Sequence, residues 1–491
     1  MNNLPEVKLG LVAVSRDCFP IELSRSRKAA VAAAFAKAGG TLCAIDTVVE
    51  NEKDALKALD ELKANGCNAL VVYLGNFGPE GPETILAQKF AGPRMFVAAA
   101  EESGKDMING RGDAYCGMLN ASYNLGLRGV KAYIPEYPVG QPNEVAAMIA
   151  EFMPIARILL GLSKLKIFGF GPRPFDFVAC NAPIKPLFDL GVEIQENSEL
   201  DLYAAYHAHK DDKRIPEVVA SMTKELGGKE NGIFTRLAQY ELTLNDWIEQ
   251  NLGASEYAAI AGKCWPAFQT QFGFVPCYVN SRFSSRLLPI SCETDIYGAL
   301  SEYIISCATE MAPTLLDINN TVPPDIYAEE IKALGKYGPN DVFMGFHCGN
   351  TPAQYLKNPE IKHQLIMKRA LEPDTEPDIT RGTLEGDLKA GDITFFRLQG
   401  GADCVLRSYI AQGEVLDVAT RSFGAIGVIA IPEMARFYRH VLIEKRYPHH
   451  GALGFAHCGK VLYETMKLLS VGDIAFNQPK GMLYPSENPW A

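Results

Sequence analysis

The chain has 491 residues, of which 47% are hydrophobic and 21% charged, ordinary values for a soluble globular protein. This length exceeds what one hydrophobic core supports, so we expect about two to four domains. The formal net charge of −11 argues against nucleic acid or an anionic membrane as the main partner.

Signals for export or membrane insertion are not found in the sequence. No apolar run approaches the roughly 20 residues that span a bilayer. Residues 1–17 lack the basic and apolar regions of a signal peptide. The twelve cysteines are scattered without a CxxC pair, which is typical of reduced thiols. We therefore expect a cytoplasmic protein.

Residues 1–164 are predicted to form a first α/β domain. Short apolar runs alternate there with helical patterns, which indicates a doubly wound parallel sheet. The expected strands are 7–14, 41–44, 69–74 and 96–100, and the expected helices include 22–38 and 53–64. Arg16 and Asn76 follow two of these strands, so they face the edge where α/β sheets bind ligands.

Residues 165–340 are predicted to form a second α/β domain. Its expected strands are 166–170, 257–261, 286–292 and 314–318, with a helix at 296–312 that completes a strand–helix–strand unit. Gly169 and Gly171 form a GxG without the third glycine of a dinucleotide fingerprint, which argues against a nicotinamide cofactor.

Two acids follow the last two of these strands. If the strands are neighbours, Glu293 and Asp317 lie roughly 5 Å apart. Carboxylates that close repel unless a proton or a cation lies between them. The alternative is structural: Glu293 and Asp295 cap the helix at 296–312, and Asp317 caps a turn. The spacing alone leaves both interpretations open.

Residues 341–491 are predicted to form a β-rich, barrel-like C-terminal domain. Segments 392–398, 404–412 and 427–431 carry β-branched and aromatic residues between glycine-rich turns. Histidines His347, His449 and His450 lie in glycine-flanked loops that could face the acidic edge. Imidazole with two carboxylates suits Mn²⁺, Fe²⁺ or Co²⁺ better than a structural zinc. The usual role of a single histidine is structural, and we assign that role to His207 and His209.

Five segments carry a resemblance to the L-fucose isomerase family, which is related to the L-arabinose isomerases. They are CETDIYGAL, LLDINN, FHCGN, DITFFRLQGG and HHGALGFAHCG. The resemblance covers nearly the whole chain, with its order of two α/β domains and a β-rich domain. In that family a glutamate, an aspartate 24 residues later and a C-terminal histidine bind a catalytic Mn²⁺. The match implies Glu293, Asp317 and His450, and the spacing is the same here.

The resemblance also implies the chemistry. Such enzymes interconvert aldoses and ketoses through an enediol, and Glu293 and Asp317 would move the proton between C2 and C1. His347 resembles a further histidine that arabinose isomerases place near the metal. The resemblance leaves two roles open for His347, binding the metal or binding the sugar. The resemblance implies a hexamer whose active sites are shared between subunits, so we expect a homo-oligomer.

Residues that contact the sugar are expected around this site. Arg16 and Asn76 would close the site of a neighbouring subunit, although Arg16 could equally be an ordinary surface arginine. Lys263 and Trp265 follow the strand beside the acids, with a core position as the alternative for Trp265. Asn350 and His449 flank the expected metal ligands. Because Arg16, Arg173 or Lys263 would suit an acidic sugar, sulfoquinovose rivals fucose and arabinose as the substrate.

Two other classes of function fit the same pattern. A non-catalytic sugar-binding protein would keep the α/β cleft without needing a metal, and metal analysis separates it from an enzyme. A metal-dependent lyase or aldolase acting on a sugar acid could use a similar site. Product analysis separates that enzyme, since an isomerase conserves the carbon count of its substrate.

Overall fold

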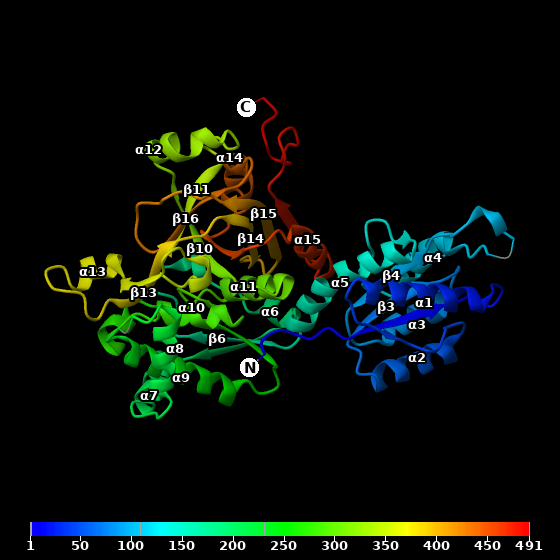
Figure 1. Cartoon of the computed structure of the whole chain (residues 1–491), viewed down its shortest axis with the longest axis horizontal. Coiled ribbons are helices and arrows are strands. Elements are labelled where there is room, and N and C mark those ends of the chain that lie inside the picture. The colour runs from blue at the N-terminus through cyan, green and yellow to red at the C-terminus, as the bar shows by residue number, and fades with distance from the viewer. Residues whose placement is uncertain (1, 109, 230, 491) are drawn as a thin grey trace. The chain divides into compact units, whose positions relative to one another are not determined.

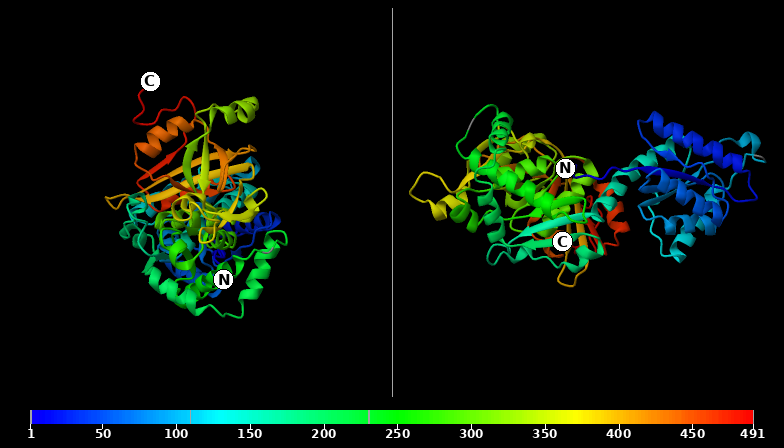
Figure 2. Two further views of the ribbon diagram at one scale, coloured as in Figure 1. Left: turned by 90° about the vertical axis from the view of Figure 1, so that its left-hand side faces the viewer. Right: turned by 90° about the horizontal axis from the view of Figure 1, so that it is seen from below.

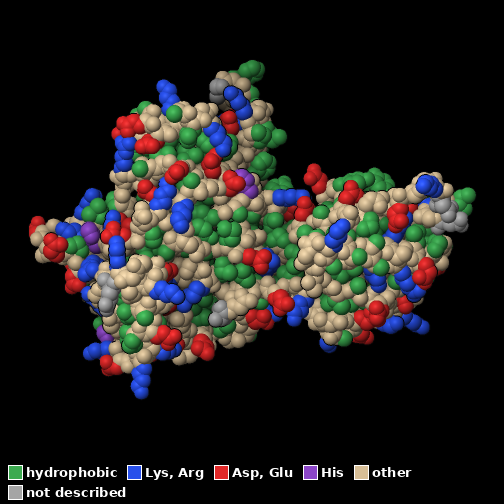
Figure 3. All heavy atoms as spheres, viewed as in Figure 1, with side chains coloured by type: hydrophobic (Ala, Val, Ile, Leu, Met, Phe, Trp, Pro, Cys, Tyr) green, Lys and Arg blue, Asp and Glu red, His purple; other side chains and the backbone are tan. Residues whose placement is uncertain are grey.

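A computed structural model describes residues 2–108, 110–229 and 231–490 of the chain. They form two compact units. The smaller unit holds Pro5–Leu160 and Lys467–Leu469, and the larger unit holds Met1–Leu4, Gly161–Met466 and Ser470–Ala491. On the visible face of each unit, acidic and basic side chains are interspersed rather than gathered by sign (Figure 3).

The smaller unit is built on a five-stranded parallel sheet with the order β2-β1-β3-β4-β5. Its strands are β1 (Leu9–Val14), β2 (Cys43–Ala44), β3 (Ala69–Leu74), β4 (Arg94–Ala99) and β5 (Val139–Gly140). The helices between them are α1 (Ile21–Lys37), α2 (Glu52–Ala64), α3 (Glu80–Lys89) and α4 (Ala114–Leu127), and α5 (Pro142–Leu162) follows β5 (Figure 1). β1 and β3 are buried throughout, as strands covered on both faces are. The predicted α/β architecture is confirmed.

Helix α5 is a long apolar segment, although the sequence analysis found no apolar run near the roughly 20 residues that span a bilayer. Within the described part of the chain it is the one helix long and apolar enough to cross a membrane by length and composition. However, 56% of its most apolar window is buried inside the protein, and Glu151 and Arg157 interrupt it. A core helix passes the same test of length and composition, so α5 is weak evidence for a membrane span.

The larger unit begins with a four-stranded parallel sheet of order β7-β6-β8-β9. These strands are β6 (Leu165–Phe170), β7 (Glu193–Asn197), β8 (Tyr257–Ala261) and β9 (Ile290–Ser291). The accompanying helices are α6 (Lys185–Asp189), α7 (Glu199–Ala208), α8 (Ile215–Glu225), α9 (Phe234–Asn251), α10 (Cys277–Ser285) and α11 (Ile296–Thr309). As predicted, Asp295 is the N-cap of α11, where its side chain accepts a hydrogen bond from the Gly298 N–H.

A nine-stranded mixed sheet makes up the rest of the larger unit. Its strands are β10 (Thr314–Thr321), β11 (Val342–His347), β12 (Glu360–His363), β13 (Arg381–Asp387), β14 (Gly391–Gly400), β15 (Leu406–Val415), β16 (Ala425–Ala430), β17 (His450–Gly454) and β18 (Asp473–Phe476). The short helices α12 (Pro324–Ile326), α13 (Leu365–Leu371), α14 (Met434–Phe437) and α15 (Gly459–Leu468) accompany them. A further pairing of β15 with β16 closes the ring β16-β11-β10-β17-β14-β15 (Figures 1 and 2). The predicted barrel-like domain is therefore confirmed.

The predicted strand–helix–strand unit around the acids is wrong. The segment that begins at Thr314 does not lie beside β9 in the parallel sheet. It forms β10 of the barrel, antiparallel to β11 and to β17. A short apolar run predicts a strand but not the sheet it joins, and the partners of β10 lie later in the sequence.

One hydrophobic core joins both sheets of the larger unit. It runs from Phe168 and Ile260 of the parallel sheet to Phe395 and Tyr409 of the barrel. The predicted domain boundaries at residues 164 and 340 stay a prediction. β10 precedes residue 340 in the chain and belongs to the barrel sheet.

Candidate active site

Four of the predicted site residues meet in one buried cluster. The Nε2 atom of His450 lies 3.4 Å from Asp317 Oδ1 and 3.6 Å from Glu293 Oε2. The Nε2 atom of His347 lies 3.5 Å from the same Glu293 oxygen. Glu293, His347 and His450 together can hold one metal ion, as can Asp317 with His449 and His450.

Strand register explains why residues so far apart in sequence meet here. β10 pairs with β17 so that Asp317 lies directly opposite His450. On its other side Asp317 lies opposite Phe346, and His347 is the next residue and the last of β11. Side chains of directly opposite residues in an antiparallel pair lie about 5 Å apart. The register of the barrel therefore brings Asp317 and His450 together, and His347 joins them from the end of the neighbouring strand.

Glu293 reaches the cluster from a turn rather than from the barrel. It lies between β9 and α11, and both Glu293 and Thr294 have left-handed backbone angles, with φ of 53° and 55°. The left-handed region costs a non-glycine residue about 1–2 kcal/mol. The Thr294 N–H holds the turn with a 2.7 Å hydrogen bond to the Gly262 carbonyl. Such strain is concentrated at functional sites, and here it aims a carboxylate at the cluster.

The cluster fits a divalent cation. Glu293 Oε2 and Asp317 Oδ1 are buried without a hydrogen-bond partner among the described residues. A buried carboxylate oxygen without a donor is costly, and a cation between the two oxygens removes that cost. The donors on offer are two carboxylates and imidazole nitrogen, a set that suits a transition-metal ion.

Glu293 and Asp295 are ionised. Burial alone would raise the pKa of Glu293, but the nearby imidazoles of His347 and His450 favour the charged form and lower it to about 2. Burial acts on Asp295 in the same way, and Arg397 and His450 more than compensate, so that its pKa lies well below the usual range. Both groups therefore carry a negative charge at neutral pH.

Sequence reasoning missed a buried network behind His450. Asp295 Oδ2 lies 2.9 Å from His450 Nδ1. The fully buried Arg397 of β14 donates to both oxygens of Asp295, at 2.5 and 2.8 Å. Gln399 in turn accepts hydrogen bonds from Arg397 at 2.6 and 2.9 Å. The available signal was Arg397 beside two phenylalanines in the predicted strand DITFFRL, since a buried charge needs a partner.

A cavity of about 250 Å³ opens onto the cluster. Its wall is largely apolar and aromatic, formed by Phe177, Trp265, Phe346, Ile366 and Met367, with Cys348, Gln364 and His449 beside the cluster residues. The indole N–H of Trp265 lies 3.3 Å from Glu293 Oε1 and donates to it. Trp265 thus lines the cavity. This is the first of the two positions predicted for it, the other being the hydrophobic core. Such a cavity is of the size that surrounds part of a sugar rather than a polymer.

The other predicted sugar contacts are placed differently. Lys263 is buried, lies 2.9 Å from Glu199 and donates to the Pro172 carbonyl, so its charge is already paired. Asn350 is buried near the end of β11, and its side-chain oxygen has no partner among the described residues. His449 lines the cavity, 3.8 Å from Asp317.

Arg16 and Asn76 belong to the smaller unit. Asn76 is buried and braces its own loop, since it accepts a hydrogen bond from the Arg16 N–H and donates to Ser15. The Arg16 guanidinium lies over the Phe77 ring and 3.4 Å from Glu80. The Arg16 side chain is half-buried and its charge is paired with Glu80.

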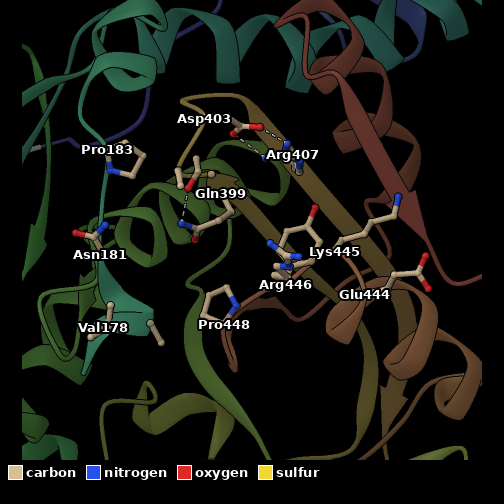
Figure 4. A pocket seen from close by; sticks show the side chains of 15 residues that line it. Val178, Asn181, Pro183, Gln399, Asp403, Arg407, Glu444, Lys445, Arg446 and Pro448 are labelled. Atoms are coloured by element: carbon tan, nitrogen blue, oxygen red, sulfur yellow. Dashed lines mark hydrogen bonds and ion pairs between the residues drawn. The ribbon is translucent and has the colours of Figure 1, made fainter. Parts of the chain in front are cut away.

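A second cavity of the larger unit, of about 750 Å³, shares two loops with the first cavity. Val178 in its wall follows Phe177 by one residue, and Pro448 precedes His449. Figure 4 shows Gln399 between the Asp403–Arg407 pair and Pro448. Because Gln399 binds Arg397, this cavity is joined to His450 by the buried network.

Comparison with known proteins gives the site its chemical context. A family model described as the N-terminal domain of fucose/sulfoquinovose isomerase matches residues 10–163. The model of the L-fucose isomerase C-terminal domain matches residues 345–475. Together the two models cover more than half of the chain.

Curated relatives agree with the family models. The chain is 25% identical over 342 residues to sulfoquinovose isomerase of Alkalicoccus urumqiensis, which covers 68% of this chain and 70% of the relative. It is 26% identical over 338 residues to sulfoquinovose isomerase of Priestia aryabhattai, with 68% and 69% covered. A match to the Clostridium sp. (strain MSTE9) sulfoquinovose isomerase is 28% identical over 176 residues, with 34% and 38% covered.

The fold and the cluster thus define a sugar isomerase that interconverts an aldose and a ketose. The chain belongs to the fucose isomerase-like family. The resemblance and the enzyme class predicted from the sequence are both confirmed. Enzymes of this family depend on a metal ion, and the described residues include candidate groups for one.

Proposed function

We propose that this enzyme interconverts sulfoquinovose and the corresponding ketose in a metal-dependent reaction. The observation that carries the proposal is the cluster of Glu293, Asp317 and His450, in which two buried carboxylate oxygens lack a partner among the described residues. The choice of sugar is supported by the relatives, which are named sulfoquinovose isomerase. L-Fucose and L-arabinose are the next candidates, because the C-terminal family model is that of L-fucose isomerase.

Glu293, Asp317 and His450 would hold the metal. When bound, a divalent cation stabilises the negative charge that develops on the first two oxygens of the sugar. We propose Mn²⁺, with Fe²⁺ and Co²⁺ as alternatives, because two carboxylates and an imidazole nitrogen suit these ions.

The chain's own carboxylates would carry the proton. Glu293 and Asp317 would lie on opposite sides of the enediol, where one takes the proton from C2 and a proton is returned to C1. Trp265 donates to Glu293 Oε1 and so holds the carboxylate beside the cavity. The low pKa of Glu293 keeps it ionised in the resting protein. The aromatic wall of Phe177 and Trp265 would exclude water from the reacting carbons.

Arg173 is our candidate for the sulfonate group. It lies in the loop after β6, two residues before Phe175, whose ring packs 5.9 Å from Trp265. Its Nε atom is buried without a hydrogen-bond partner among the described residues. Arginine binds planar and tetrahedral oxyanions well because it offers several N–H donors. Lys263, the other predicted cation, is already paired with Glu199.

We further propose a cytoplasmic homo-oligomer, a hexamer by family resemblance, in which Arg16 and Asn76 help to close the site of a neighbouring subunit. Helix α4 supports an interface on the smaller unit. Its residues Tyr115, Leu119, Tyr123 and Leu127 are spaced four apart and are 61–68% exposed, so they form an apolar stripe on one face.

The test is an assay of chelator-stripped enzyme with and without Mn²⁺ in D₂O. The panel holds sulfoquinovose, L-fucose, D-arabinose, L-arabinose and L-rhamnose. We expect Mn²⁺-dependent formation of a ketose with solvent deuterium from sulfoquinovose, at a higher kcat/KM than from the neutral sugars. A neutral sugar as the best substrate would refute the proposed sugar. Cleavage products with fewer carbons would refute isomerisation.

A further inference from the structure

Two histidines present the same ring nitrogen to the cluster. Their ring centres lie 6.0 Å apart, and Nε2 of each lies within 3.6 Å of Glu293 Oε2. Judged from the cluster side alone, His347 and His450 are equivalent candidates for a metal ligand. The partners of their other nitrogen, Nδ1, distinguish them.

His450 has its proton on Nδ1. That atom lies 2.9 Å from Asp295 Oδ2, and an ionised carboxylate can only accept a hydrogen bond. Asp295 is kept ionised by the two hydrogen bonds from Arg397 and by the Gly298 N–H. A neutral imidazole with its proton on Nδ1 has its lone pair on Nε2, and this lone pair faces Glu293 and Asp317. This arrangement is the one in which a second carboxylate orients a metal-binding histidine.

His347 has the opposite arrangement. Its Nδ1 accepts a 2.9 Å hydrogen bond from the backbone N–H of Cys348. A backbone amide can only donate, so Nδ1 of His347 carries the lone pair. In the neutral ring the proton is then on Nε2, and His347 presents an N–H to the cluster. A second proton, on Nδ1, would point at the amide hydrogen of Cys348.

We infer that the two histidines have different tasks in the proposed reaction, on which this inference rests. His450 supplies the imidazole lone pair to the metal, and Asp295 is its positioning residue. His347 is not a metal ligand. It is a catalytic residue whose Nε2–H donates a hydrogen bond to a sugar oxygen beside Glu293, where negative charge develops.

The first experiment compares one substitution at both histidines. Mn²⁺ binding to chelator-stripped protein is measured by calorimetry without any sugar, for the wild type, His450→Gln and His347→Gln. We expect His450→Gln to weaken Mn²⁺ binding by about tenfold or more, the range seen when metal sites lose a supporting group. His347→Gln should change the Kd less than about threefold while kcat falls by about a hundredfold, as when a preorganised donor is lost. Equal losses of Mn²⁺ affinity would overturn the inference.

A second experiment observes the tautomers directly. Solid-state NMR of metal-free protein labelled with ¹⁵N-histidine distinguishes protonated from unprotonated ring nitrogens, and the two Gln variants assign the signals. We expect a proton on Nδ1 of His450 and on Nε2 of His347. A proton on Nδ1 of His347 would overturn the assignment.

The outcomes separate this inference from the proposed function. The Mn²⁺ titration and the NMR measurement need no sugar, so both can succeed in a protein that isomerises none of the sugars tested, and only the comparison of kcat depends on the proposed function. Conversely, an active sulfoquinovose isomerase in which His347→Gln abolishes Mn²⁺ binding would retain the proposed function and refute the division of tasks.

Discussion

Glu302 offers a sharp test of the electrostatics beneath the site. It lies in α11, and its side chain is completely buried. Burial is the main cause that raises its pKa from an ordinary 4.5 to about 8. The folded protein therefore holds a proton at neutral pH that the unfolded chain releases. The associated stability is present below about pH 4.5 and is lost as the pH rises toward 8.

The magnitude follows from linkage. Between the two pKa values, the free energy of unfolding should fall by up to about 1.4 kcal/mol per pH unit because of this one group. Over two pH units, from about 5.5 to 7.5, the loss is about 3 kcal/mol. Glu302→Gln cannot ionise, so its stability relative to the wild type should rise by this amount over the same interval.

The assay is urea unfolding of metal-free wild type and Glu302→Gln at a series of pH values, followed by circular dichroism. Glu217, an exposed glutamate of α8, provides the matched control, since Glu217→Gln removes a carboxyl group without a burial cost. Parallel pH curves for the wild type and Glu302→Gln would refute the reasoning. Glu83 repeats the test in the smaller unit, because burial also raises its pKa to about 8.

The remaining predictions concern the site and the surface. Glu293→Gln and Asp317→Asn should each lower kcat by about a thousandfold or more while the circular dichroism spectrum is unchanged, and near-normal turnover in either would refute their assignment. Arg173→Met should raise KM for sulfoquinovose about tenfold or more and leave KM for a neutral aldose unchanged; equal effects on both would exclude a sulfonate contact. Leu119→Glu should shift the oligomer toward smaller species in light scattering, whereas Leu56→Glu, at another exposed leucine of the smaller unit, should not. An unchanged mass for Leu119→Glu would exclude α4 from the interface.

Much of the fold could be predicted from the sequence because local pattern decided it. β1 and β3 are apolar along their whole length, which is typical of buried parallel strands. β10 shows where this reasoning ends. Its apolar residues predict a strand, but its partners are chosen by packing and by pairing with segments later in the chain.

The candidate site shows the same division. Glu293, Asp317 and His450 could be named because sequence spacing and family resemblance point to them. Asp295 was predicted only as a helix cap. Its carboxylate does accept from the Gly298 N–H, but it also binds Arg397 and His450, which come from distant segments of the chain. The pairing of Lys263 with Glu199 was equally hidden, since the two residues belong to different segments that meet only in the folded chain.

The closed ring of the barrel has a consequence for how a metal ion enters. Asp317, His347 and His450 lie on strands of a ring joined by main-chain hydrogen bonds on every side. A register slip of one residue would turn a side chain to the opposite face, and a closed ring has no free edge along which a strand could slip. The backbone positions of these three residues are therefore fixed before any ion arrives. Only Glu293 lies outside this frame, on its strained turn, so the adjustment that an incoming ion requires is confined to a single peptide loop.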